Sequence, residues 1–324
     1  MHKGRLEVEY EPRVLDLPCI SKVSGNILQR LLRGLPYDCP AKMHTEYGTR
    51  CAPSRPAQEQ ITEVTPPKTL KGAICEILKV AEQAGNKLSP QQVFESLCEQ
   101  YSNDDIQAIE CITTGQSENK CWFEHRIGMI TASVAHNVYT RVHTIRTKMG
   151  PHDVRALLKL VMRESKVTTA DMRRGVKLEA AAKSAYLSQN KKHNHLKIHG
   201  RGLCVLQHRP FLGASPDGVV SCACCPARLI EVKCPKSLEQ FVRSEVCHGS
   251  DPMQLKEKSR YFSQVQVQMG ITGLATADVF VYVSDTQTIT LNVSFSKEYF
   301  DSVVERATFF FLHYVLPHIV QSAS

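Results

Sequence analysis

The chain has 324 residues, 42% of them hydrophobic, which is enough to bury a core in one large domain, or one medium domain with an appendage. Residues 1–20 mix charged and apolar side chains, and the most apolar stretch, Phe309 to Val320, contains two histidines and a proline. We therefore expect no secretory signal, no membrane span and an intracellular location, cytoplasmic or nuclear. Thirteen cysteines without framework spacing favour reduced thiols over disulfides.

The net charge of +8 is unevenly distributed along the chain. Residues 1–120 contain 14 Lys and Arg against 16 Asp and Glu, so residues 121–324 hold 26 against 16, a net charge of +10. The segment from Arg141 to Lys192 contains 13 basic and 4 acidic residues. This density suits contacts with nucleic-acid phosphates, although a solvated basic surface explains the same composition.

The first part of the chain carries helix signals but no candidate site. Residues 1–65 show little periodicity, and the Pro, Ser and Thr content from Ala52 to Pro67 indicates a linker. The sequence Ser-Pro-Gln-Gln at residues 89–92 predicts a capping box with proline at the first helical position. Helices are expected over Leu70 to Ala84, from Pro90 onwards, and around Asp104 to Cys111.

Beyond Trp122 the chain alternates between helical and strand patterns. This order predicts an α/β (α+β) fold with a central mixed sheet flanked by helices. Helices are expected near Thr131 to Val138, Asp153 to Arg163, Ala170 to Gln189, Arg260 to Gly270 and Lys297 to Leu316, and strands at Gly202 to Gln207, Phe211 to Ala214, Leu229 to Lys233, Asp278 to Val283 and Thr288 to Val293.

The strongest candidate site combines a Ser-Pro-Asp-Gly turn at Asp217 with a Glu-Val-Lys strand fourteen residues later. Alternate side chains share one face of a strand, so Glu231 and Lys233 point the same way while Val232 packs on the other face. A hairpin through residues 222–227 brings Asp217 to face Glu231. Two converging carboxylates form a site for Mg²⁺ or Mn²⁺, and a neighbouring lysine suits phosphodiester hydrolysis. A surface salt bridge is the alternative for Glu-Val-Lys by itself.

Two further side chains are candidates for this site. Glu179 shares a helical face with the small residues Gly175 and Ala182, which predicts a closely packed helix with Glu179 directed at a partner rather than at water. A solvated glutamate is the alternative. Gln264 lies on the helix expected from residue 260 and is suited to hold a water or a phosphate oxygen. By pattern alone, Gln266 or Gln268 could take this role instead, and a solvent-exposed amide on the helix surface is the alternative for Gln264.

These residues belong to an ordered set of motifs that resembles the YqaJ-like viral recombinases. That family belongs with bacteriophage lambda exonuclease in the PD-(D/E)XK nuclease superfamily, so the resemblance implies a restriction-endonuclease-like core. It covers about residues 109–316. With the composition of the first part of the chain, we expect an N-terminal segment and linker (1–65), a helical region (66–115) and a nuclease domain (116–320). The motifs are Trp122-(x3)-Arg126, Ile130-Thr131-Ala132-Ser133, Gly175-(x3)-Glu179, Ser215-Pro216-Asp217-Gly218, Glu231-Val232-Lys233-Cys234-Pro235 and Gln264-Val265-Gln266.

The resemblance implies a role for each matching residue. Arg126, with Ser133 near it, resembles a pocket that grips a 5′-terminal phosphate, since a planar guanidinium can bind two phosphate oxygens at once. A surface ion pair is the alternative for Arg126. The other implied roles are metal ligation by Asp217, Glu231 and the carbonyl of Val232, action on the attacking water by Lys233, positioning of that water by Gln264, and a second metal or its waters held by Glu179.

The function implied is a Mg²⁺-dependent deoxyribonuclease of viral or mobile-element origin, acting in recombination or repair. We expect a 5′ to 3′ exonuclease on double-stranded DNA, with an endonuclease of the same superfamily as one alternative. A non-catalytic DNA-binding module is another, which the intact Asp217, Glu231 and Lys233 oppose. Partners implied are duplex DNA, a single-strand annealing protein and further copies of the chain.

One loop departs from the phage pattern. Cys222, Cys224 and Cys225 lie where the phage enzyme has a short polar hairpin. They could form a zinc site with Cys234, Cys247 or His248, which would suit a zinc-organised interaction protein. No second Cys-x2-Cys pair completes a recognised spacing, so reduced thiols are favoured over zinc.

Overall fold

The computed structural model describes residues 66–164 and 169–323. The N-terminal segment and linker expected over residues 1–65 lie outside the described residues. The first elements are three helices, α3 (Leu70–Gln83), α4 (Pro90–Glu99) and α5 (Asn103–Ile112), at the positions where three helices were expected. The capping box is confirmed, because the Ser89 amide donates to Gln92 Oε1 at 2.9 Å and the Gln92 amide donates to Ser89 Oγ at 3.3 Å.

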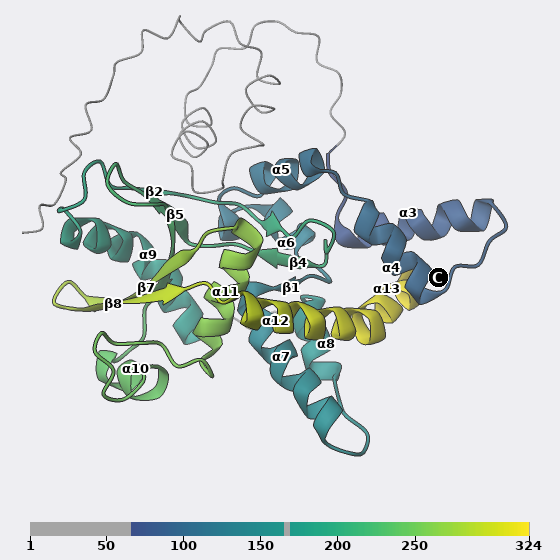
Figure 1. Cartoon of the computed structure of the whole chain (residues 1–324). Helices are drawn as coiled ribbons and strands as arrows, with labels where there is room; N and C mark the ends of the chain where they lie inside the picture. The colour runs from purple at the N-terminus through teal and green to yellow at the C-terminus, as the bar shows by residue number, and fades with distance from the viewer. Residues whose placement is uncertain (1–65, 165–168, 324) are drawn as a thin grey trace, which may run out of the picture. The chain divides into compact units, whose positions relative to one another are not determined.

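The central sheet has five strands in the order β2-β5-β6-β7-β8 (Figure 1). Only β6 and β7 run parallel, and the remaining neighbours are antiparallel. The predicted α/β fold with a mixed sheet is therefore confirmed. The strands are β2 (Lys197–His199), β5 (Gly218–Ser221), β6 (Arg228–Lys233), β7 (Thr276–Ser284) and β8 (Gln287–Ser294).

A second, smaller sheet has the order β1-β4-β3. Its strands are β1 (Ile130–Thr131), β3 (Cys204–Val205) and β4 (Leu212–Ala214). The strand predicted over Gly202 to Gln207 is thus only two residues long. Gly202 lies outside this strand, at a position that leaves no room for a side chain beside the backbone of Glu110.

Helices α9 (Ala170–Gln189) and α11 (Arg260–Thr272) cover opposite faces of β6. Ala182 of α9 packs in one apolar cluster with Val232, whereas Gln264 of α11 donates to Glu231. Adjacent strand residues point to opposite faces, so the two helices sandwich the strand. The remaining helices are α6 (Lys120–His125), α7 (Ala132–Thr147), α8 (Arg155–Val161), α10 (Leu238–Glu245), α12 (Lys297–Phe310) and α13 (Leu316–Ala323).

A buried polar network fixes α9 to the sheet. The Tyr186 hydroxyl donates to Asp278, and Arg228 donates to Asp278 Oδ2 at 2.7 Å and to the Tyr186 oxygen at 2.9 Å. Asn292 donates to the other Asp278 oxygen at 2.5 Å. Because a buried charge costs stability unless it is paired, this network requires α9, β6, β7 and β8 to adopt one arrangement.

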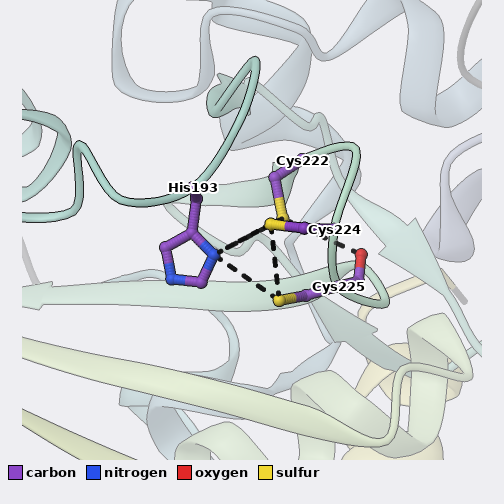
Figure 2. A group of neighbouring side chains, drawn as sticks. All are labelled: His193, Cys222, Cys224 and Cys225. Atoms are coloured by element: carbon purple, nitrogen blue, oxygen red, sulfur yellow. Dashed lines mark hydrogen bonds between the residues drawn. The ribbon is translucent and has the colours of Figure 1, made fainter.

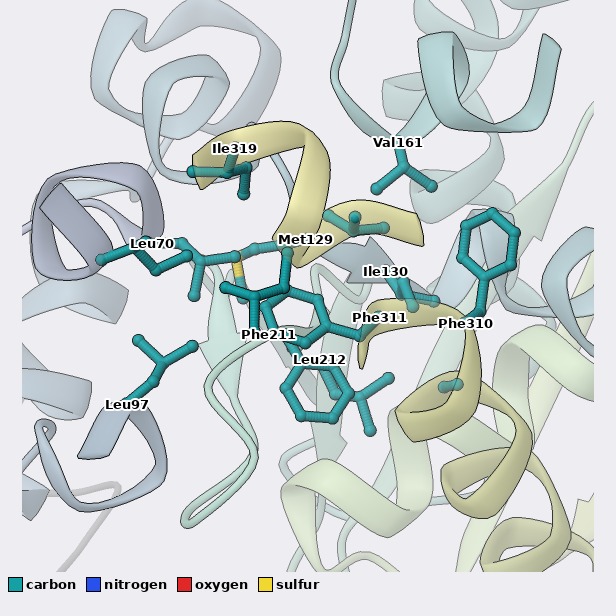
Figure 3. Close-up of a cluster of buried hydrophobic side chains, with 14 of the residues drawn as sticks. Leu70, Leu97, Met129, Ile130, Val161, Phe211, Leu212, Phe310, Phe311 and Ile319 are labelled. Atoms are coloured by element: carbon teal, nitrogen blue, oxygen red, sulfur yellow. The ribbon is translucent and has the colours of Figure 1, made fainter. Parts of the chain in front are cut away.

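The main apolar core joins the helical region to the C-terminal helices (Figure 3). The ring of Phe211 stacks on that of Phe311 at 4.4 Å and lies 5.7 Å from that of Phe94 on α4. The helix expected from Lys297 to Leu316 is interrupted by a π-helical turn at Phe311–Val315, which buries two consecutive phenylalanines, Phe310 and Phe311. Among the described helices, none combines the length and apolar character needed to cross a membrane.

Candidate active site

The β5–β6 hairpin brings Asp217 to the C-terminal end of β6. Gly218 pairs with Ile230, which ends the β5–β6 ladder. One residue earlier, Asp217 Oδ2 accepts the amide of Val232 at 2.7 Å. The N–H and C=O of one strand residue point to the same side. The Val232 carbonyl therefore faces the side of β6 on which Asp217 lies.

Glu231 is the most deeply buried carboxylate of the group, with 3% of its surface exposed. Its Oε1 accepts from Lys233 Nζ at 2.5 Å and from Gln264 Nε2 at 2.6 Å, and its Oε2 accepts from Gln268 Nε2 at 2.7 Å. A carboxylate oxygen has two acceptor positions, so Oε2 keeps one for a further ligand. These three donors fix the carboxylate in one orientation.

Asp217 lies in a setting that disfavours its charge. Burial and then the neighbouring Glu231 carboxylate raise its pKa to about 8, with Glu179 adding to the effect and Lys233 opposing it. A divalent cation would remove this repulsion between carboxylates. Asp217, Glu231 and the Val232 carbonyl together supply the hard oxygen donors that Mg²⁺ or Mn²⁺ prefers.

Lys233 is held as a cation despite its burial. Burial lowers its pKa, but Glu231 and then Asp217 outweigh that effect, and the pKa is raised. Its Nζ also donates to Gln264 Oε1 at 3.2 Å and lies 5.0 Å from the centre of the Tyr261 ring. The ammonium is therefore placed to donate hydrogen bonds rather than to accept a proton.

The structure shows which of the three candidate glutamines on α11 lie at this group of charged residues. Gln264 contacts both Glu231 and Lys233. Gln268 lies one helical turn later and donates to Glu231, while its Oε1 is buried without a hydrogen-bond partner. Gln266 points elsewhere, because it donates to the Ser294 carbonyl at 2.8 Å and accepts from the Ser296 amide at 2.8 Å.

Glu179 is placed at the edge of this group rather than within it. Its side chain is 42% exposed and pairs with Lys183 at 2.6 Å. Ala182 packs closely on the sheet as expected. The expected close packing is not found at Gly175, however, since a Cβ there would meet nothing within 4 Å. Glu179 therefore faces both solvent and the site, and the expectation that it points away from water is wrong.

Arg126 lies in a second group of polar side chains. Its guanidinium stacks on the Trp122 ring at 3.7 Å, and Trp122 Nε1 donates to Ser215 Oγ at 2.8 Å, two residues from Asp217. Burial, and then the charge of Arg163, hold the pKa of Arg126 well below its ordinary value. Its Nε is buried without a hydrogen-bond partner. The surface ion pair considered for Arg126 is not found among the described residues.

Arg163 completes this group from the end of α8. Its Nη2 donates to Thr131 Oγ1 at 2.9 Å, and Thr131 Oγ1 lies 3.2 Å from Ser133 Oγ. Its Nε is likewise buried without a partner. Thr131 occupies the N-cap position of α7, at the positive end of a 16-residue helix, and its side chain makes no capping hydrogen bond. Two arginines, two hydroxyls and a helix N-terminus together form a site suited to an anion.

A comparison with family models identifies the central part of the chain. Residues 121–275 match the model of the YqaJ-like viral recombinase domain. This segment belongs to that family. The YqaJ-like domain therefore contains every residue of both groups described above, from Trp122 to Gln268.

Solved structures similar to the chain include exonucleases from bacteria and a herpesvirus. An alkaline exonuclease from Laribacter hongkongensis is 24% identical, with a TM-score of 0.47, 62% of this chain covered and 94% of that one. The Shutoff and Exonuclease Protein of Kaposi's sarcoma-associated herpesvirus is 12% identical, with a TM-score of 0.42 and coverage of 93% and 95%. These likenesses are too distant to transfer a residue's role. A search of the curated proteins found no match.

Sequence reasoning missed one residue of the YqaJ-like domain's polar groups, Arg163, and left another, Gln268, as an open alternative to Gln264. Arg163 was expected only as the end of a helix, and its φ of 58° shows that the chain has already left the helix there. No local pattern places it 2.9 Å from a threonine 32 residues earlier. Gln268 was recoverable in part, because it follows Gln264 by four residues on one helical face.

Proposed function

We propose that this chain is a metal-dependent exonuclease that degrades double-stranded DNA from 5′ ends. The observation that carries the proposal is the convergence of Asp217, Glu231 and Lys233 at the end of the β5–β6 hairpin. Two carboxylates with one ammonium suit the hydrolysis of a phosphodiester, in which negative charge develops on phosphate oxygens. Asp217, Glu231 and the Val232 carbonyl would hold Mg²⁺ or Mn²⁺, and Glu179 would hold a second ion or its waters.

The chain's own residues account for most of the proposed chemistry. A bound divalent cation would supply Lewis acidity at the scissile phosphate and lower the pKa of a water. Lys233, kept charged by Glu231, donates a hydrogen bond that orients the attacking water and stabilises the developing charge. Gln264, which contacts both of these residues, positions the same water. Gln268 holds the Glu231 carboxylate in place.

The anion site formed by Arg126 and Arg163 supports an exonuclease over an endonuclease. An enzyme that cuts internally has no need for a pocket fitted to a terminal phosphate. Here two guanidiniums, with Thr131 and Ser133, lie next to the Ser215 turn that leads to Asp217. We propose that they bind the 5′-terminal phosphate and so place a nearby bond at the metal site.

The basic surface supports the choice of substrate. Within the Arg141 to Lys192 segment, Arg146 and Arg155 pair with carboxylates, whereas Lys177, Lys191 and Lys192 are exposed around α9. We propose that these lysines contact DNA phosphates and that affinity depends little on base sequence. We also propose that the nuclease domain extends to about residue 320, since α12 and α13 share the core of β1 and β4.

The test is incubation of purified protein with 5′-labelled linear duplex DNA and with covalently closed circular DNA, with and without Mg²⁺. We expect the linear duplex to be degraded from its ends only with Mg²⁺, and the circle to persist. Rapid cutting of the circle would establish the endonuclease instead. DNA binding without cleavage at any divalent-metal concentration would favour the non-catalytic module.

A further inference from the structure

Four side chains with metal-binding atoms meet at the turn end of the β5–β6 hairpin, away from the proposed active site (Figure 2). Cys222, Cys224 and Cys225 lie in the turn that joins the two strands, and His193 lies in the loop between α9 and β2. Their three sulfurs and the imidazole nitrogen all lie within 4.8 Å of one another. The partners considered from the sequence, Cys234, Cys247 and His248, are not part of this group.

The spacing of the ligand atoms matches a tetrahedral site. His193 Nδ1 lies 3.3, 3.5 and 3.8 Å from the sulfurs of Cys224, Cys225 and Cys222. The sulfur of Cys224 lies 3.6 Å from that of Cys222 and 3.8 Å from that of Cys225. Bonds of about 2.3 Å to sulfur and about 2.0 Å to nitrogen at tetrahedral angles require edges of about 3.8 and about 3.5 Å.

Disulfide bonding does not account for this arrangement. A disulfide requires sulfurs about 2.05 Å apart, whereas the sulfurs here are separated by 3.6 and 3.8 Å and all three cysteines are free. Thiols are also weak hydrogen-bond donors and acceptors, so mutual hydrogen bonding gives little reason for three of them to surround one imidazole. Three thiolates and a neutral imidazole, in contrast, form a common zinc ligand set.

We propose that His193, Cys222, Cys224 and Cys225 bind one structural Zn²⁺. Four protein ligands leave no open position for a water or substrate, which distinguishes a structural zinc site from a catalytic one. Cys222 and Cys225 have the Cys-x2-Cys spacing, and His193 takes the place of a second pair. The spacing of the cysteines did not identify this histidine as a partner, because it lies 29 residues before Cys222.

A bound Zn²⁺ would connect the loop between α9 and β2 to the turn between β5 and β6, which few hydrogen bonds join otherwise. The Ala223 amide donates to the Asn194 carbonyl at 2.9 Å, and β2 pairs with β5 through Lys197 and Ser221. β2 has only three residues, so this edge of the sheet has few hydrogen bonds. Zinc would add bonds between the loop that follows α9 and the hairpin that carries Asp217 and Glu231 at its far end.

The proposal does not depend on the proposed nuclease function. Asp217 and Cys222 are five positions apart at the two ends of the extended strand β5, a span of roughly 16 Å. The two sites also differ in ligand chemistry, since one offers oxygens and the other offers sulfurs and an imidazole. Zinc bound at the turn should therefore remain when the active site is disabled, and Asp217→Asn serves to separate the two.

The first test measures metal in the full chain purified without chelators. We expect about one zinc per chain, and cobalt in place of zinc should give the intense visible absorption of tetrahedral cobalt thiolate. Cys224→Ser and His193→Ala should each lower zinc content at least about tenfold, as expected when a ligand is lost from a closed site. Matched controls are Cys247→Ser and His195→Asn, the latter chosen because asparagine tolerates the φ of 56° at this position.

Stability gives the second readout. A strong chelator should lower the melting temperature of the wild-type chain to that of Cys224→Ser and leave the variant unchanged, because metal binding adds to folding stability. Asp217→Asn should retain its zinc and its chelator response. The proposal is overturned if purified wild-type protein takes up neither zinc nor cobalt, if His195→Asn lowers zinc as much as His193→Ala, or if intact mass shows these cysteines joined as a disulfide.

Discussion

The two ends of the β5–β6 hairpin place different chemistry on the same pair of strands. At one end, Asp217, Glu231 and Lys233 form a buried group of charges in which burial and repulsion raise the pKa of Asp217. At the other end, Cys222 and Cys225 with their neighbours form a cluster near the surface. Metal preference follows ligand type, so the first end suits Mg²⁺ or Mn²⁺ and the second suits Zn²⁺.

The two ends of the hairpin also differ in which parts of the fold hold their side chains in place. The charged end depends on distant elements, because Gln264 and Gln268 of α11 hold the Glu231 carboxylate. The thiol end depends mainly on one short turn and needs a single distant residue, His193. Damage to the charged end should therefore remove activity with little loss of zinc, and damage to the turn should act mainly on stability.

The largest effect is expected at Lys233. Lys233→Ala removes the ammonium that faces both carboxylates, so cleavage of duplex DNA should fall at least about a hundredfold. The matched control is Lys236→Ala, three residues along, whose side chain is 72% exposed and 3.9 Å from Asp171. Single-turnover cleavage rates measure both. Equal cleavage rates for Lys233→Ala and Lys236→Ala would show that Lys233 takes no part in cleavage.

A smaller effect is expected at the proposed 5′-phosphate site. Arg126→Ala or Arg163→Ala should cost roughly 1.5–3 kcal/mol of binding to a charged group, which is roughly tenfold to a hundredfold in preference for a 5′-phosphate end. Arg155→Ala at the start of α8, where Arg155 pairs with Asp153, should leave the preference intact. The comparison uses duplexes that differ only in a 5′-phosphate or 5′-hydroxyl. If wild-type protein degrades both equally, the end-recognition proposal fails.

Without divalent cations, the stability of the folded chain is expected to depend on pH through Asp217. The pKa of Asp217 is raised from 3.8 to about 8, so between these values the folded chain keeps a proton that the unfolded chain has lost. Its contribution to the free energy of unfolding should therefore decline as pH rises from about 4 to about 8. Asp217→Asn should lack this decline. Denaturant unfolding at several pH values measures the free energy of unfolding of the wild type and of Asp217→Asn. The same pH dependence in both would contradict the raised pKa of Asp217.

The sequence predicted the parts of the site that local periodicity controls. Strand alternation was enough to place Glu231 and Lys233 on one face, and the hairpin return brought Asp217 to β6 as expected. The helix over Ala170 to Gln189 was predicted with both ends correct. In each of these cases a period of two or 3.6 residues, or a turn of fixed length, determines the geometry.

The parts that were missed depend on contacts between distant segments. Arg163 meets Thr131 from the end of α8, and His193 meets the cysteines across 29 or more residues, so no spacing rule connects them. Gly175 was misinterpreted for a related reason. A small residue on a helix face predicts close packing only where the sheet continues beneath it, and here nothing lies within 4 Å.

The most direct test of the proposed active site is single-turnover cleavage of a 5′-phosphorylated linear duplex by Asp217→Asn and by the wild type, at matched Mg²⁺ and with zinc content measured on the same preparations. We expect Mg²⁺-dependent degradation by the wild type, a loss of at least about a hundredfold in the variant, and equal zinc in both. Wild-type-like cleavage by Asp217→Asn would contradict the proposed active site.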